Sequence, residues 1–238
     1  MELMGLKQIS PDQIIFWQKG FVVINATIVY AWIVMAFLVG VSWLVTRRLS
    51  SGVDIPPLQN LLEALVSAIR NEIRETSQDD PDKYMGFIAT LFLFILISNL
   101  LTVIPGFVPT TASLSTTGAL AVCVFLAVPI YGVKSRGFID YLKQYIRPTV
   151  FMLPFNIMGE LSRTLALAVR LFGNIMSGTK IAAILLAISP LVFPVLMQLL
   201  GLITGVIQAY IFAILAMVYI ASGTRVHHEN FEEQKGDR

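Results

Sequence analysis

The sequence predicts an all-α, polytopic membrane protein with about five membrane helices and one amphipathic surface helix. Of its 238 residues, 56% are hydrophobic and only 13% are charged, whereas soluble domains typically carry about 25% charged residues. Residues 85–133 and 181–224 contain no Asp, Glu, Lys or Arg. Each run is longer than the roughly 20 apolar residues that cross a bilayer. We therefore expect one membrane domain, residues 1–238, with the lipid bilayer as its solvent.

The membrane helices are expected in five stretches. These are residues 21–45, 85–104, 114–133, 155–189 and 192–222. After Pro56 and Pro57, apolar residues recur at helical spacing while charged and amide side chains lie off the stripe, which predicts an amphipathic helix over residues 57–75. We expect this helix on the cytoplasmic membrane surface or against a partner.

The last two helices are longer than a membrane crossing requires. The 35 residues between Pro154 and Pro190 form a helix of about 50 Å, and the hydrocarbon layer is only about 30 Å thick. Either the helix breaks, at Gly173 or Gly178, or it is steeply slanted. We favour a slant for this helix and the next, because neither glycine alone forces a break.

Basic residues indicate the orientation. Arg47, Arg48, Arg70 and Arg74 lie on the same side as the basic loop of residues 134–147, whereas the loop of residues 105–113 has no charge. The positive-inside rule then places the amino terminus outside and the carboxyl terminus in the cytoplasm. The tail, residues 225–238, is expected to be solvated.

Several functions are disfavoured by the residues. Cys123 is the only cysteine, so no internal disulfide is possible. His227 and His228 are adjacent and do not share a helical face, and no Cys/His cluster suggests a metal. A Gly-rich phosphate loop is also missing, so we expect no cofactor and no catalysis by this chain alone. The net charge of +2 gives no indication of a nucleic-acid partner.

A polar stripe runs along the fourth predicted membrane helix. Its members are separated by four and three residues in alternation, which places them on one helical face. They are Asn156, Glu160, Arg163, Leu167, Arg170, Asn174 and Ser177, and every member but Leu167 is polar. A charge at membrane depth costs about 2.5–3.5 kcal/mol on insertion scales. The stripe should therefore face protein or a water-filled cavity.

Arg170 has no evident counter-ion. No acidic residue lies three or four positions from it, and the other four predicted spans contain no Asp or Glu. Because a guanidinium does not release its proton, Arg170 calls for an anion from outside the membrane region of this chain. The alternative is a structural role, in which Arg170 snorkels or is held by backbone carbonyls. Glu160 and Arg163 can pair with each other, for structure or function, and Lys180 can snorkel from the helix end.

The last helix carries Gln208 and a face of small residues. Gly201 and Gly205 are four residues apart, which allows another helix to approach closely. Gln208 either faces Arg170 across the antiparallel pair or has an ordinary packing role.

Four segments carry a resemblance to a known family. "LALAVRLFGNIMSG", "IQAYIFAILAMVYI", "FIATLFLFILISNLLTVIPG" and "TTASLSTTGALAV" resemble subunit a of the F-type rotary ATP synthase, and the similarity runs over residues 24–220. The resemblance implies a stator channel beside a ring of c subunits that carry mid-membrane carboxylates, with subunit b of the peripheral stalk as a second partner. It also implies a bacterial inner-membrane location.

The resemblance assigns roles to residues. Arg170 matches the essential arginine, and Asn174 and Gln208 match the polar positions beside it. Glu160, Arg163, Ser177 and Asn156 are then candidates to line two offset half-channels, one from each side of the membrane. The arginine would lower the pKa of a ring carboxylate and prevent a direct leak between the half-channels.

The sequence departs from the family pattern on the outer side. Thr179, followed by Lys180, and Gly201 stand where many members have Glu or His, and Ser113 replaces a frequent Asp. These changes leave the outer path, and the choice between protons and sodium ions, open. Two rival functions also remain at this point: a secondary transporter or channel working alone, although no internal repeat supports it, and a structural anchor for other subunits.

Overall fold

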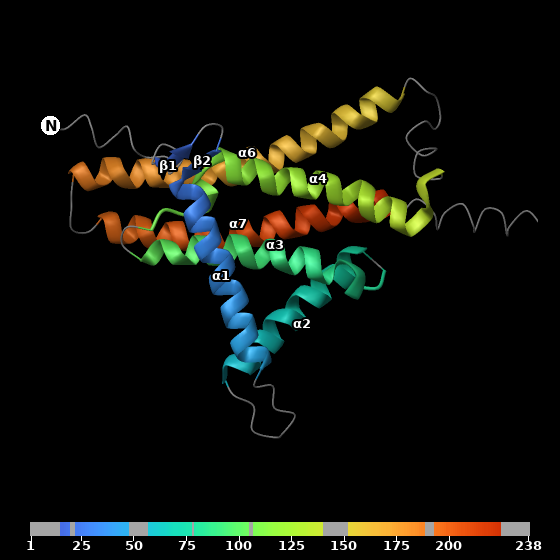
Figure 1. Ribbon diagram of the computed structural model, residues 1–238, viewed down its shortest axis with the longest axis horizontal. Helices are drawn as coiled ribbons and strands as arrows, with labels where there is room; N and C mark the ends of the chain where they lie inside the picture. Colours follow the sequence, from blue (N-terminus) through green and yellow to red (C-terminus); the bar gives the residue numbers. More distant parts are fainter. Residues whose placement is uncertain are drawn as a thin grey trace, which may run out of the picture.

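The computed structural model describes residues 15–19, 22–47, 57–77, 79–104, 107–139, 152–188 and 193–224. Long helices make up almost all of the described chain (Figure 1). They are α1 (Ala26–Thr46), α2 (Pro57–Ser77), α3 (Asp82–Leu100), α4 (Leu114–Arg136), α6 (Met152–Ile188) and α7 (Phe193–Thr224). Two 3₁₀ turns, η2 (Leu101–Val103) and η3 (Thr110–Ala112), lie between α3 and α4. The tail and the basic loop beyond residue 139 lie outside the described residues.

A small β-hairpin precedes the first helix and was not expected. Strand β1 (Ile15–Lys19) pairs antiparallel with β2 (Val22–Asn25). The prediction of a helix from residue 21 is therefore wrong at its start, and α1 begins at Ala26. The physical reason is local: Val22, Val23 and Ile24 are consecutive β-branched residues, which favour extended backbone.

Four of the helices are long and apolar enough to span a membrane. They are α1, α3 together with η2, α4 and α7. Helix α6 is longer than any of them but carries Glu160, Arg163, Arg170 and Lys180, and its polar side chains lower its hydropathy. The architecture is thus the expected polytopic helical one.

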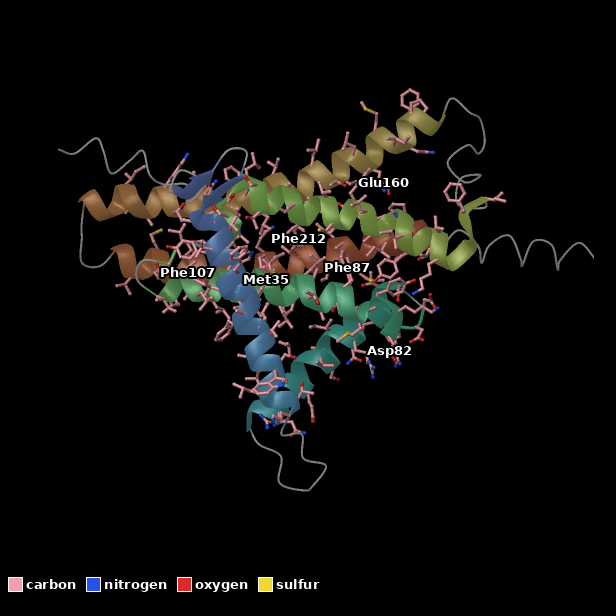
Figure 2. The ribbon with its side chains drawn as sticks, viewed as in Figure 1. Met35, Asp82, Phe87, Phe107, Glu160 and Phe212 are labelled. Atoms are coloured by element: carbon pink, nitrogen blue, oxygen red, sulfur yellow. The ribbon has the colours of Figure 1, made fainter. Side chains whose placement is uncertain are left out.

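Helix α7 is the centre of the bundle. It packs against α2, α3, α4 and α6, and α6 also packs against α4 (Figure 1). Its buried side chains include Ala209, Ala213, Ala216 and Ala221, with Phe212 fully enclosed among them (Figure 2). In lipid, helices associate through close packing and not through the hydrophobic effect. Small side chains along α7 allow several neighbours to approach it at once.

Helix α6 is continuous from Met152 to Ile188, 37 residues, without a break at Gly173 or Gly178. At 1.5 Å per residue its length is about 55 Å, well above the thickness of the hydrocarbon layer. Helix α7, with 32 residues, is about 48 Å long. Both lengths agree with slanted helices, although the tilt in a membrane remains a prediction.

Charged residues gather at the turn between α2 and α3. The Lys83 ammonium donates to the Asp79 carboxylate at 3.0 Å, and Arg70 pairs with Asp82. The hydrogen bond from Lys83 holds the pKa of the Asp79 carboxyl below its ordinary value. We call this end of the bundle the charged end. The opposite end, at residues 107–113, carries no charge.

The packing around α7 predicts the effect of an enlarged side chain. Ala216 has no exposed surface, so Ala216→Leu adds volume where no space exists and should destabilise the fold by about 1–3 kcal/mol. Thermal unfolding in detergent should show a lower midpoint. Val218→Leu is the matched control, because Val218 on the same helix is 41% exposed. Equal midpoints for the two variants would contradict the packing described here.

Candidate functional site

Arg170 lies at the edge between the buried and exposed faces of α6. Leu167 and Leu171, its neighbours toward the core, are 2% and 0% exposed, whereas Val169 is 60% exposed. Arg170 itself is exposed. On the adjacent α7, an apolar group is also uncovered: Ile203, Val206 and Ile207. Arg170 thus has an exposed apolar neighbour on its own helix, and α7 also exposes apolar side chains.

The described part of the chain pairs Arg170 with no carboxylate. Two ion pairs form among the described residues, Arg70–Asp82 and Lys83–Asp79. Both lie at the charged turn between α2 and α3. This agrees with the expectation that the chain supplies no membrane carboxylate for Arg170. A fixed cation in apolar surroundings, without an anion of its own, favours an anionic partner on another protein.

A large cavity of ≈ 270 Å³ opens between α6, α7 and the end of α3. Two of the predicted residues, Asn174 and Ser177, line it together with Thr179. Residues that we did not assign to an ion path complete its polar lining: Asn99, Thr102, Gln198 and Thr204. The cavity lies toward the uncharged end of the bundle, since Pro109 also lines it. None of its lining residues is ionisable.

Hydroxyl groups that line this cavity donate their protons to backbone carbonyls, so their oxygens remain available as hydrogen-bond acceptors. Ser177 donates its proton to the carbonyl of Asn174 at 3.0 Å, and Thr179 donates to that of Met176 at 3.0 Å. Thr204 donates to the carbonyls of Leu200 and Gly201 in the same way. With their protons engaged, these oxygens present lone pairs. Such a lining suits water and hydrated cations.

A small cavity of ≈ 10 Å³ lies toward the charged end, between α4, α6 and α7. Glu160, labelled in Figure 2, and Arg163 both line it. Tyr219 and Ser222 of α7 complete the polar lining, and the Arg163 guanidinium carbon lies 5.9 Å from the centre of the Tyr219 ring. This volume is about that of one water probe.

Arg170 lies between the two cavities along α6. The small cavity reaches α6 as far as Thr164 and the large cavity begins at Asn174, a separation of about 15 Å along the helix axis. On α7 the corresponding gap runs from Thr204 to Tyr219 and contains Gln208. The two cavities share no lining residue.

Gln208 is 5% exposed, and its Nε2 is buried without a hydrogen-bond partner among the described residues. The sequence left open whether Gln208 faces Arg170 or only packs, and the burial is compatible with either role. Asn156 lines neither cavity and is exposed near the start of α6.

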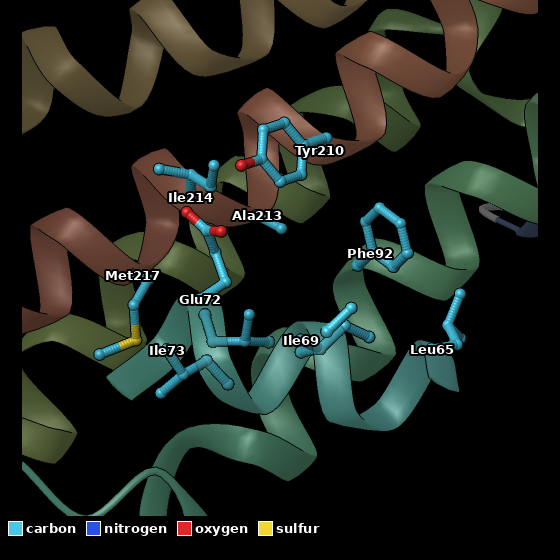
Figure 3. Close-up of a pocket in the computed structure, with 11 residues that line it drawn as sticks. Leu65, Ile69, Glu72, Ile73, Phe92, Tyr210, Ala213, Ile214 and Met217 are labelled. Atoms are coloured by element: carbon cyan, nitrogen blue, oxygen red, sulfur yellow. The ribbon is translucent and has the colours of Figure 1, made fainter. Parts of the chain in front are cut away.

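A third pocket, of ≈ 150 Å³, lies at the junction of α2, α3 and α7 (Figure 3). Its walls are apolar except for Glu72 of α2 and the hydroxyl of Tyr210 of α7. It involves none of the predicted site residues. Within the described residues, no three His, Cys, Asp or Glu side chains cluster as metal ligands do.

Comparison with known proteins gives a consistent result. A sequence model of the family described as "ATP synthase A chain" matches residues 28–221. The chain is 61% identical over 223 residues to "ATP synthase subunit a 2" of Picosynechococcus sp., covering 93% of this chain and 95% of the relative. It is 58% identical over 224 residues to "ATP synthase subunit a 2" of Acaryochloris marina, covering 94% and 96%. It is also similar to "ATP synthase subunit a" of Albidiferax ferrireducens, 59% identical over 218 residues.

The large cavity predicts a pattern of water access. In a Cys123→Ser background, Ser177→Cys and Thr204→Cys should react with a water-soluble maleimide in membrane vesicles, because a thiol needs water contact to ionise and react. Leu171→Cys should remain unlabelled, since Leu171 is fully buried. Labelling is read by mass spectrometry. Protection of both cavity positions, with the bilayer intact, would contradict a hydrated cavity.

Proposed function

Because the chain belongs to the ATP synthase A-chain family, we propose that Arg170 and the two flanking cavities form the site that passes ions to and from a rotating ring of c subunits. Members of this family are the stator, ion-translocating subunit of the membrane sector. The chain is therefore an integral membrane component of the ATP synthase complex with several spans. It does not itself catalyse ATP chemistry.

The exposed position of Arg170, between two separate polar cavities, carries the proposal. In this proposal the ring docks on the face of α6 and α7 where Val169, Val206 and Ile207 are uncovered. A ring carboxylate that enters this face loses its ion and is attracted to the guanidinium. The fixed positive charge disfavours ion binding there and lowers the pKa of that carboxylate.

The two cavities serve as the half-channels. Asn174, Ser177 and Thr204 line the one toward the uncharged end, and Glu160 and Arg163 line the other. Because Arg170 separates them, an ion cannot pass directly and must travel with the ring. Each elementary charge that crosses 100 mV releases about 2.3 kcal/mol, so several ions must cross for each ATP made. Asn156 has no support from the cavities and is the weakest member of this set.

The charged end faces the cytoplasm in this proposal. Arg74 lies in the last turn of α2 and Lys134 near the end of α4, both close to that end, and the positive-inside rule places such basic regions in the cytoplasm of the bacterial inner membrane. The amino terminus is then outside, and the large cavity opens to the outer side. Subunit b of the peripheral stalk is the second partner, and α1 offers uncovered Trp32, Val39 and Trp43 to lipid or to that partner.

We expect Arg170→Ala to abolish ATP-driven ion uptake by vesicles that contain the whole complex, with a decrease of at least about 100-fold. Arg170→Lys should also fail, because an ammonium lacks the planar fork of donors that a carboxylate binds. Lys180→Ala is the matched control, since Lys180 is exposed on the same helix and lines neither cavity. Wild-type uptake by Arg170→Ala would leave only an anchoring role for the chain.

The transported ion is a proton or a sodium ion, and the same vesicles decide between them. The neutral lining of the large cavity accommodates either ion as a hydrated species. For a sodium-coupled complex, ATP-driven uptake should rise with sodium concentration and persist with a protonophore. A proton-coupled complex should acidify the vesicles independently of sodium. Robust flux through the chain reconstituted without its partners would instead support a stand-alone channel.

A further inference from the structure

A buried polar cluster joins the end of α3 to the middle of α7. Asn99 is 3% exposed, and its Nδ2 donates to the backbone carbonyl of Gly205 at 3.0 Å. Its Oδ1 accepts from the Thr111 hydroxyl of η3 at 2.8 Å. The Gly205 carbonyl can only accept a hydrogen bond, so this bond fixes which way the amide points and directs its donor side at α7.

The contact depends on a glycine in α7. A Cβ placed on Gly205 would lie 2.9 Å from the Cβ of Asn99, a distance that forces one of the helices to move. Gly205 is therefore the residue that allows α3 and α7 to approach closely enough for this hydrogen bond. A second bond follows two turns away, where the Gln198 Nε2 donates to the Thr102 carbonyl at 2.6 Å. Together the two bonds set the axial register of α7 against α3.

The clamp formed by Asn99 and Gly205 lies where the large cavity ends on α7. Thr204 lines the cavity, Gly205 is buried, and the buried Gln208 follows one turn later. The Gly205 carbonyl belongs to the helical turn that continues into Gln208. A shift of this turn along the axis of α7 would therefore move Gln208. The packed region between the two cavities would then open and connect them.

We propose, on the basis of the proposed function, that Asn99 is a positioning residue that acts through the Gly205 carbonyl. It holds the turn that carries Gln208 and closes the inner end of the large cavity. Its side chain also touches that cavity, so a direct role as an ion ligand is the competing interpretation. The two roles differ in which kinetic quantity they change.

The test compares four variants of the whole complex in vesicles. Asn99→Leu removes both side-chain hydrogen bonds at similar volume, and Gly205→Ala pushes α7 away without changing a polar group. Both should lower the maximal rate of ATP-driven ion uptake about tenfold, at an unchanged half-saturating ion concentration. Ser98→Ala and Gly118→Ala are the matched controls and should keep the wild-type maximal rate per assembled complex. Ser98 bonds to Thr110 of η3, and a Cβ on Gly118 meets nothing within 4 Å.

A direct measurement of the clamp uses hydrogen–deuterium exchange. Exchange of the backbone amides of residues 203–210 should increase in Asn99→Leu and Gly205→Ala but not in Ser98→Ala. If Asn99→Leu does not assemble, Thr111→Val, which removes one of the two side-chain hydrogen bonds of Asn99, should give the same pattern with smaller changes.

Two results would overturn the clamp: a higher half-saturating ion concentration for Asn99→Leu with an unchanged maximal rate, or a silent Gly205→Ala. Failure of the proposed function is recognised separately. In that case Arg170→Ala transports ions like the wild type, whereas the exchange experiment still reports whether Asn99 holds α7.

Discussion

The uncompensated charge of Arg170 is the constraint on which the rest of the structure depends. A guanidinium at membrane depth is costly, and the described chain offers it no carboxylate. Burying the guanidinium within the bundle would require an anionic partner there. Exposing it to lipid alone would leave the free-energy cost of the charge without compensation. The structure instead anchors α6 through Leu167 and Leu171 and presents Arg170 at the edge of that face. In the proposed function, a moving carboxylate on a neighbouring ring would satisfy the charge intermittently.

Close packing around α7 is the counterpart of that exposed charge. Two polar cavities lie within one bundle, and a leak between them would uncouple ion flow from rotation. Helix α7 fills the space between the cavities. Its buried face there consists of small residues, such as Ala209 and Ala213, and of Phe212. Small side chains bring neighbouring backbones close together. The same helix therefore supports the cavities at its two ends and excludes water between them.

The sequence predicted the features that repeat along one helix. The alternating spacing of the polar stripe identified Arg170. It also identified four residues that line cavities in the structure: Asn174 and Ser177 line the large one, and Glu160 and Arg163 line the small one. The length of the uncharged runs predicted the helical class. The hairpin of β1 and β2 was missed because a short β-branched run beside an apolar span resembles the start of a membrane helix.

Contacts between distant segments could not be predicted in the same way. Asn99 and Gly205 are 106 positions apart, and Gln198 and Thr102 are 96 apart, so no spacing rule connects them. Tyr219 and Arg163 likewise meet only because α6 and α7 are antiparallel neighbours. The available signal was the Ser98–Asn99 pair, two polar residues at the end of an otherwise apolar span. This pair indicated a buried polar site but could not indicate that Gly205 of α7 is its partner.

The continuity of α6 is what allows one arginine to serve two cavities. Glu160 and Asn174, which line different cavities, are 14 positions apart, only about 40° short of four full helical turns. Both therefore lie on nearly the same face of one continuous helix, with Arg170 between them in the sequence. A break at Gly173 would rotate the second half of the helix and turn Asn174 away from the face that carries Glu160. The length that exceeds the bilayer is thus a consequence of keeping both cavities in phase with a single charge.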